Sequence, residues 1–477
     1  MLEDWVYGLK NVYRLSPKWI RRSVGGVYGR LPIAVRLGRT YLKARAFLEE
    51  SQWWTPEELR EWQRLELARL LQHAYRNVPY YKRIFDERKL KPQDIRGPED
   101  MCLLPILTRD LVRQNLDSLI ATNMPSMRRL RFTTGGSTGT PLALYWERGR
   151  TRSLERAFMW RQWSWAGYHP DRRERTVVLR GHVTRNRLGD YDPIENALIL
   201  SSYHMRNNAL DDYVRRIRAF EPTSIQAYPS VISILAAHML RVSIRPIDSL
   251  RVVICASENL LPQQRMLIES AFGCRVFDFY GQGEQVALAG NCECSNLYHV
   301  FSEYGVAELV DQSGELIAEP DGKGQVVATG FNNYLMPLIR YATGDVAIRR
   351  PGTCQCGRSY PLWERIEGRV QEYVLAKDGR AVSLTGLIFG LHFDAFGRMR
   401  QIQLVQRKRG AVTVRISKTA SYTDQDEQEI EEKIKDAMKE DLDISFEYVD
   451  EIKRTEAGKH RFLIQELPIA QHWDSFR

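Results

Sequence analysis

The sequence of 477 residues lacks features that mark several common classes of protein. It contains no apolar run near the roughly 18 residues that a membrane-spanning helix requires. Its start, MLEDWVYGLKNVYRL, has early acidic residues and no apolar core, which disfavours a secretory signal. Seven cysteines in so long a chain do not indicate a disulfide framework. We therefore expect a cytoplasmic protein in a reducing environment.

Acidic residues are also scarce near the N-terminus. Residues 1–45 carry ten Lys or Arg but only Glu3 and Asp4, so this segment supplies most of the net charge of +10. Aromatic residues, among them Trp19 and Tyr28, are interspersed. Such a segment either forms a helical pair packed on the body, which we favour, or contacts an anionic membrane or glycan-synthesising machinery. No nucleic-acid motif accompanies it, so we expect no nucleic-acid partner.

The remaining sequence predicts an α/β fold. Residues 52–80 begin as a helix does, with Thr55 as N-cap, Pro56 in the first turn and two acidic residues after it. Between residues 175 and 280, short β-branched runs alternate with helical patterns, which indicates parallel strands covered by helices. An antiparallel β subdomain follows from His299 to about Arg350. We expect an N-terminal helical segment (1–50), a large domain (51–366) and a small α+β domain (367–477).

The stretch TTGGSTGTP at 133–141 interrupts two strand-like segments. It is either a flexible spacer or a turn whose backbone amides and hydroxyls hold an anion. It is not the common phosphate loop, because Thr140 stands where that motif has lysine. ASEN at 256–259 and YGQGE at 280–284 follow predicted strands, where α/β sheets bind ligands.

Five segments in order resemble the adenylate-forming ligase superfamily: TTGGSTGTP, YGQGE, YATGD (341–345), GR (368–369) and KRTEAGKHR (453–461). NVPYYKRIF and LPILTRDLVRQN are similar to the phenylacetate–CoA ligase branch, and AYPSVISILA and YGQGEQVALAGNCE to its capsular-polysaccharide members. The resemblance covers about residue 50 to the end. It implies a large adenylate-forming domain with a small, mobile C-terminal domain.

The resemblance also implies roles for particular residues. The loop would hold the ATP phosphates, and Tyr280 would lie against adenine beside Gly281. Asp345 would accept both ribose hydroxyls, and Arg369 would contact the ribose or a phosphate. Lys459 would meet the reacting carboxylate, and Glu284 would hold Mg²⁺. The family's hinge acid is missing, since Gln371 stands there. The other nucleotide-site candidates are Thr133, Thr134, Gly135, Ser137, Thr138, Gly139, Ser257 and Glu258.

Cysteines gather in two short segments, CECSNLYH and CQCG, which offer five ligands for zinc. A structural zinc takes four ligands in a tetrahedron. Family members resemble this chain at four positions, which leaves Cys294 as the spare. The alternative is a set of free thiols. The expected ligands are Cys292, His299, Cys354 and Cys356.

The resemblance implies an AMP-forming acid–thiol ligase-like enzyme. ATP and a carboxylate would give an acyl-adenylate, and coenzyme A would take the acyl group, in surface polysaccharide biosynthesis. Alternatives are an amine or sugar acceptor, or a non-catalytic nucleotide-binding scaffold. A homodimer would suit the branch. Residues that follow strand ends either line the acyl pocket or are ordinary loop residues: His182, Tyr203, His204 and Tyr228.

Overall fold

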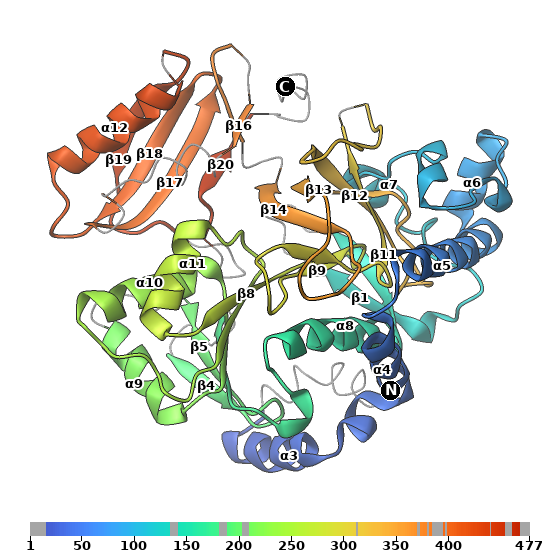
Figure 1. Cartoon of the computed structure of the whole chain (residues 1–477), viewed down its shortest axis with the longest axis horizontal. Coiled ribbons are helices and arrows are strands. Elements are labelled where there is room, and N and C mark those ends of the chain that lie inside the picture. The colour runs from blue at the N-terminus through green and yellow to red at the C-terminus, as the bar shows by residue number, and fades with distance from the viewer. Residues whose placement is uncertain are drawn as a thin grey trace.

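A computed structural model of the chain describes most of its 477 residues (Figure 1). The described ranges are 16–133, 142–180, 188–202, 209–311, 313–369, 373–378, 381–383, 395, 398–438, 440–453 and 460–467. No helix within these ranges is both long and apolar enough to cross a membrane.

Four helices lead into the body. They are α3 (Lys18–Arg30), α4 (Ile33–Ser51), α5 (Pro56–Asn77) and α6 (Pro79–Glu87). The Thr55 side chain accepts from the Glu58 N–H while Glu58 accepts from the Thr55 N–H, so α5 begins at the predicted signal. α4 packs along α8 (Thr151–Trp165) through an edge-to-face contact of Tyr41 and Trp160. Residues 18–51 thus contain two helices, of which α4 packs on the large domain.

A continuous twelve-stranded sheet forms the centre of the described structure. Its order is β11-β12-β13-β14-β10-β9-β8-β7-β6-β3-β5-β4, and the five strands from β8 to β5 run parallel. The parallel part comprises β3 (Thr176–Arg180), β5 (Ala197–Ser201), β6 (Ser224–Ala227), β7 (Val252–Ala256) and β8 (Arg275–Gly281). The antiparallel members are β4 (Gly189–Asp192), β9 (Leu288–Gly290), β10 (Tyr298–Val300), β11 (Gly305–Val310), β12 (Lys323–Gly330), β13 (Tyr341–Arg350) and β14 (Leu362–Arg369).

Helices cover both faces of the parallel strands, as predicted. α9 (Leu210–Phe220), α10 (Pro229–Arg241) and α11 (Pro262–Phe272) share one core with Val253 and Val276. α4 and α8 share another with Val252 and Phe277, because alternate residues of a strand face opposite sides. The predicted parallel sheet and antiparallel β subdomain are both present, but β8 pairs with β9 and joins them into one sheet. The β4–β5 hairpin was not predicted.

Shorter elements complete the large domain. β1 (Arg129–Thr133) and β2 (Ala143–Glu147) form a separate antiparallel pair. Helix α7 (Arg109–Gln114) precedes them, and the described connections include 3-10 helices at Pro92–Asp94, Pro98–Leu103, Ser126–Arg128 and Pro170–Arg172.

The C-terminal unit has a sheet and a core of its own. Its strand order is β19-β18-β17-β20, from β17 (Met399–Lys408), β18 (Ala411–Lys418), β19 (Asp443–Tyr448) and β20 (Leu463–Gln465). Helix α12 (Asp424–Met438) buries Ile430, Ile434 and Met438, which are spaced by four residues. β15 (Tyr373–Leu375) pairs with β16 (Ala381–Ser383) beside it. The predicted α/β fold with a smaller α+β C-terminal domain is confirmed.

A buried ion pair within the β subdomain also contacts the connection between α6 and α7. The Arg340 guanidinium contacts both oxygens of Glu308 at 3.0 and 3.2 Å and donates to the Leu104 carbonyl at 2.8 Å. Both side chains are almost fully buried. Burial raises the pKa of Glu308, although the Arg340 guanidinium opposes that rise. The carboxylate thus depends on one cation.

We expect Arg340→Met to lower the free energy of unfolding by about 3–5 kcal/mol, because the Glu308 carboxylate is left buried without its cation. Arg350→Met is the control, since Arg350 lies half-exposed beside Asp321 and Glu364 and such pairs contribute under about 1 kcal/mol. Urea denaturation followed by tryptophan fluorescence measures both. Equal midpoints for the two variants would contradict this account of Glu308.

Candidate active site and metal centre

Two of the predicted motifs lie at adjacent strand ends. Tyr280 and Gly281 end β8, and Ser257 and Glu258 directly follow β7, its parallel neighbour. Ser257 has φ +71°, a left-handed conformation that costs of order 1–3 kcal/mol for a residue with a side chain. Such strain is found at functional sites more often than elsewhere. The carboxyl edge of the parallel strands is therefore the place to look for a ligand.

Tyr280 and Asp345 meet across this edge. The Tyr280 hydroxyl donates to Asp345 Oδ2 at 2.8 Å. Asp345 is buried, with 8% of the residue exposed. Asp345 lies opposite Arg369 in the register of β13 and β14, although the side chain of Arg369 is not among those described. Three residues predicted for the nucleoside thus come together from three strands.

Glu284 lies on the same side of β13. Its Oε1 accepts from the Tyr341 hydroxyl at 3.2 Å and is 3.7 Å from the Arg109 guanidinium. The side chain of Glu284 is 9% exposed, so this carboxylate is largely shielded from water. No role was predicted for Arg109 or Tyr341, although Tyr341 begins YATGD and Arg109 lies within LPILTRDLVRQN.

The strands that flank the Gly-rich stretch are fixed against the YGQGE motif. β1 and β2 pair antiparallel up to Thr133 and Ala143, as expected of a turn between strands. The Trp146 indole N–H of β2 donates to the Gly283 carbonyl at 3.2 Å. Trp146 also stacks on Phe132 of β1 at 4.0 Å. The loop residues themselves lie outside the described ranges: Thr134, Gly135, Ser137, Thr138 and Gly139.

Gln282, in the middle of the same motif, has unused hydrogen-bonding capacity. Its amide nitrogen and oxygen are both buried, and neither bonds to any described residue. Buried polar atoms are nearly always paired, so such an amide is suited to a bound polar ligand. No role was predicted for Gln282, although its position between Tyr280 and Glu284 indicates that it lies at the same site.

Glu258 connects the large domain to the C-terminal unit. Its Oε2 accepts from the Ser230 N–H at 3.0 Å, and its Oε1 accepts from the His460 N–H at 3.1 Å. His460 is buried and its Nε2 lies 2.8 Å from the Ile402 carbonyl of β17. Lys459 itself lies outside the described ranges, but its immediate neighbour is held at the end of β7.

Of the predicted acyl-pocket residues, the structure describes only Tyr228. It follows β6, caps the start of α10, and is partly buried against the core of the parallel sheet. His182, Tyr203 and His204 lie outside the described ranges. The acyl pocket therefore stays a prediction.

Three thiols and an imidazole converge at another point of the sheet. The ligand atoms of Cys292, His299, Cys354 and Cys356 all lie within 4.8 Å of one another. Cys292 Sγ is 3.6 Å from Cys354 Sγ, and Cys356 Sγ is 3.3 Å from His299 Nε2. Cys294 is exposed and does not belong to this group. This set of donors has the composition of a tetrahedral zinc site.

The pKa shifts within this cluster differ in direction, since burial raises the pKa of the Cys356 thiol to about 12 whereas His299 and Cys292 shift toward the form that binds a metal. Burial lowers the pKa of His299, so its imidazole is held neutral, as a ligand must be. Burial alone would raise the pKa of Cys292, but bonds from Ser295 and the Cys294 N–H outweigh it and lower that pKa. The Asn291 N–H donates to the carbonyl of Asp278, a β8 residue that precedes Tyr280. Cys292 follows Asn291 on the antiparallel path, so the cluster lies on the side of Asp278 away from Tyr280. This separation fits a structural site.

We expect Glu258→Ala to speed amide hydrogen exchange at Ser230 and His460, because both N–H groups lose a carboxylate acceptor. A hydrogen bond to a charged group contributes about 1.5–3 kcal/mol, which corresponds to roughly tenfold faster exchange or more. Glu269→Ala is the matched control, because Glu269 of α11 accepts from the Val276 N–H of β8 and contacts neither Ser230 nor His460 through that bond. Hydrogen exchange is measured by mass spectrometry. An unchanged exchange rate at His460 in Glu258→Ala would contradict the hydrogen bond from the His460 N–H to Glu258.

Comparison with known proteins places these features in context. A model of the CapK C-terminal domain matches residues 375–466. A phenylacetate-coenzyme A ligase of Thermus thermophilus is 27% identical over 331 residues, which cover 67% of this chain and 72% of that protein. Protein CapK of Staphylococcus aureus is 23% identical over 479 residues, which cover 96% of this chain and all of that protein.

A solved structure shares the fold. 2-Hydroxyisobutyryl-CoA ligase in the postadenylation state, in complex with R3-HIB-AMP, aligns with a TM-score of 0.70 at 18% identity, over 89% of this chain and 94% of that one. The same ligase in its thioesterification state, with 2-HIB-AMP and CoA, aligns with a TM-score of 0.57. The predicted resemblance and the prediction of a ligase-like chain are thus confirmed. The chain is related in sequence to phenylacetate–CoA ligases and to CapK, matches a model of the CapK C-terminal domain over residues 375–466 and has the fold of adenylate-forming CoA ligases.

Proposed function

We propose that this protein activates a carboxylic acid with ATP and transfers the acyl group to coenzyme A. The observation that carries the proposal is the convergence of Tyr280, Glu284 and Asp345, with the ends of the Gly-rich stretch, at one edge of the sheet. A non-catalytic scaffold would not need these residues together. The names of the related ligases favour coenzyme A over an amine or sugar as the acceptor.

The reaction has two steps. A carboxylate oxygen attacks the α-phosphorus of ATP, and pyrophosphate leaves, which gives an acyl-adenylate. The thiol of coenzyme A then attacks the acyl carbon, and AMP leaves with the carboxylate oxygen, while the thiol proton passes to solvent. Both steps develop negative charge on oxygens, so the site must supply donors and cations that face those oxygens.

The nucleoside half of ATP would bind at Tyr280 and Asp345. Asp345 is an acceptor with two oxygens and suits the two ribose hydroxyls. The Tyr280 hydroxyl already donates to Asp345 Oδ2, which fixes the orientation of the carboxylate. The free amide of Gln282 would add a donor and an acceptor for the base or the phosphates. Ser257 at the end of β7 would border the same site.

Glu284 is suited to Mg²⁺ bound with the ATP phosphates. Only its Oε1 contacts described residues, Tyr341 and Arg109, so Oε2 remains for a metal. Mg²⁺ typically takes one or two carboxylates together with substrate phosphates, and it would neutralise phosphate charge there. Arg109 would hold Glu284 and face the same phosphates.

Lys459 would provide a mobile cation for the first step. The bond from the His460 N–H to Glu258 holds the adjacent residue at the edge of the sheet that carries the other candidates. A lysine there would stabilise charge on the α-phosphate as the carboxylate attacks. Glu258 would then act as a positioning residue for the C-terminal unit. We also propose a role in surface polysaccharide biosynthesis, which the match to CapK along the whole chain supports.

We further propose that the cluster of Cys292, His299, Cys354 and Cys356 holds a structural zinc ion. Three thiolates and one imidazole complete a tetrahedron and leave no open position for a substrate. The metal would connect the segment after β9 to the loop before β14. The salt bridge between Arg358 and Glu293, at 2.9 Å, already joins the same two segments.

We expect carboxylate-dependent ATP–pyrophosphate exchange with wild-type protein over an acid panel that includes phenylacetate and 2-hydroxyisobutyrate. Lys459→Ala should lower the exchange rate roughly 100-fold or more, because a charge-stabilising group is lost. Lys453→Ala is the control for a nearby exposed lysine. Asp345→Asn should weaken ATP binding. No exchange with any acid, together with intact ATP binding by calorimetry, would contradict the ligase and favour the scaffold.

We expect about one zinc per chain in protein purified without chelator, as measured by plasma mass spectrometry. Cys292→Ser and Cys354→Ser should lose most of the metal and unfold at lower temperature, because metal binding contributes to folding free energy. Cys294→Ser should retain both, since that thiol lies outside the cluster. Zinc retained by Cys292→Ser, or absent from wild type, would exclude this site.

A further inference from the structure

The outward side of the N-terminal helices exposes large apolar side chains. On α3, Trp19 is 70% exposed, Val24 56% and Val27 65%, and Val35 of α4 is 52% exposed. Single exposed apolar residues are common on protein surfaces, but here four lie within 17 residues of sequence. We call this set, with the basic residues described next, the α3 surface.

Basic residues of the same helices divide by the side they face. Arg21, Arg36 and Arg45 reach the body and pair with Asp190, Glu195 and Asp171. Other basic side chains are exposed and make no ion pair with any described residue: Arg22, Arg30, Arg39 and Lys43. Residues 18–45 contain no Asp or Glu at all. These exposed basic side chains thus have no neutralising carboxylate within residues 18–45.

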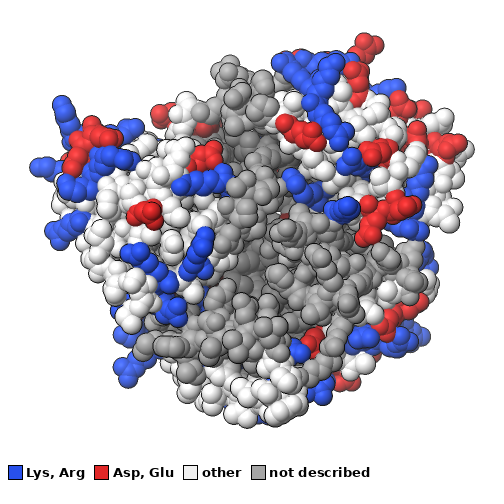
Figure 2. All heavy atoms as spheres, turned by 180° about the vertical axis from the view of Figure 1, so that it is seen from behind, with Lys and Arg blue, Asp and Glu red and all other residues white. Residues whose placement is uncertain are grey.

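Other parts of the described surface mix both charges. Figure 2 shows acidic and basic side chains close together toward its upper left and along its right side. On α5, for example, Arg60 pairs with Glu57 and Arg64 with Glu61. The α3 surface differs because its charges have one sign and alternate with apolar groups.

Contacts with the β4–β5 turn hold α3 in place. Arg21 contacts Asp190 of β4 at 3.0 Å. A Cβ at Gly29 would lie 2.5 Å from the Pro193 carbonyl oxygen, so only glycine allows the helix to approach the turn this closely. The helix is therefore fixed at one end of the large domain, beside β4 (Figure 1).

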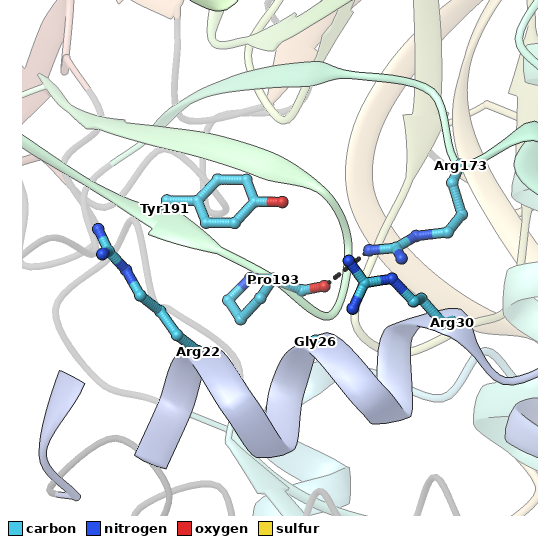
Figure 3. Close-up of a pocket in the computed structure, with 6 residues that line it drawn as sticks. All are labelled: Arg22, Gly26, Arg30, Arg173, Tyr191 and Pro193. Carbon is cyan, nitrogen blue, oxygen red and sulfur yellow. Dashed lines mark hydrogen bonds between the residues drawn. The ribbon is translucent and has the colours of Figure 1, made fainter. Parts of the chain in front are cut away.

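A pocket of about 330 Å³ lies between α3 and this turn (Figure 3). Arg22, Gly26 and Arg30 line one side at intervals of four residues, which is one face of the helix. Gly26 leaves the space open, because the nearest atom to a Cβ there would be Arg30 Nη1 at 3.6 Å. The other side is formed by Arg173, Tyr191 and Pro193.

The pocket concentrates positive charge. Arg30 and Arg173 both extend toward the Pro193 carbonyl, to which Arg173 Nη2 donates at 2.9 Å (Figure 3). None of the described residues that line the pocket is acidic. The guanidinium groups of Arg30 and Arg173 lie together, whereas Arg22 extends to the other side of Tyr191 and Pro193 (Figure 3). Two neighbouring guanidinium groups repel one another and favour an anion between them, and a guanidinium fork matches the geometry of a phosphate group.

We propose that the α3 surface docks this protein on a membrane of anionic phospholipids. The lipid phosphate occupies the pocket lined by Arg22, Arg30 and Arg173. Trp19, Val24 and Val27 enter the boundary between headgroups and acyl chains, as the apolar face of an interfacial helix does. The exposed Arg39 and Lys43 add attraction to the leaflet charge.

Vesicle co-sedimentation of the full chain, without substrates, tests this. We expect binding to vesicles of 70% phosphatidylcholine and 30% phosphatidylglycerol, little binding to pure phosphatidylcholine, and loss at high salt. Arg22→Ala/Arg30→Ala should weaken binding roughly 25-fold, since each surface charge contributes about fivefold. Its control is Arg245→Ala/Arg400→Ala, two exposed arginines elsewhere that make no ion pair with a described residue.

Two further comparisons separate the parts of the proposal. Trp19→Ala/Val27→Ser should weaken binding roughly tenfold, whereas Val242→Ser/Met266→Ser, exposed apolar residues elsewhere, should not. Arg39→Ala/Lys43→Ala should weaken binding less than Arg22→Ala/Arg30→Ala, because neither residue lines the pocket. Equal losses for the two basic pairs would overturn the pocket as a headgroup site.

Equal binding to the two vesicle types, or unchanged binding by the Arg22/Arg30 variant, would overturn the membrane proposal. Calorimetry with inorganic phosphate tests whether the pocket binds a free anion instead of a lipid phosphate. Phosphate that binds in an Arg30-dependent way without any vesicle binding would assign the pocket to a free anion and overturn docking. Because vesicle binding needs no turnover, its failure is distinguishable from failure of the proposed ligase activity.

Discussion

The candidate site depends on the pairing that makes two sheets into one. β8 ends the parallel half with Tyr280, and β9, β10 and β14 carry the hydrogen bonding across to β13, where Asp345 lies. The Tyr280 hydroxyl closes this path by bonding directly to Asp345. A shift of one residue in any of these registers would turn Asp345 to the opposite face and separate the two side chains. The register of the antiparallel strands is therefore as important to the site as the parallel strands that precede it.

The cysteine cluster lies where it can protect that register. Cys292 follows β9, His299 belongs to β10, and Cys354 and Cys356 precede β14, so the cluster links the three strands between the two halves. These strands are short: β9 and β10 have three residues each. Short strands supply few ladder hydrogen bonds, and a cross-link among their ends would compensate. This placement, away from Tyr280 and Asp345, supports the structural role proposed above for a bound metal.

Much of the fold could be predicted because its signals are local. Thr55, Pro56 and Glu58 mark the start of α5 within four residues, and the β-branched runs of β3 and β7 are visible without any partner. The β4 strand could not be predicted, because GDYD has no apolar pattern and pairs only through β5. The site shows the same division. Tyr280, Glu284 and Asp345 belong to recognisable motifs, whereas Arg109 acquires its place only by meeting Glu284, 175 positions later in the chain. Five ligands were visible for a metal, but only the fold brings four together.

The position of α3 within the molecule has a mechanical consequence. In Figure 1, α3 and the C-terminal sheet lie at opposite ends of the large domain. A chain held by α3 would carry its C-terminal unit outward, on the side away from the support. Movements of that unit would then displace water and not lipid, and the anchoring point would stay at rest while the far end swings. Membrane attachment and the catalytic movement would involve opposite ends of the molecule, so the protein would not have to leave the membrane for the C-terminal unit to move.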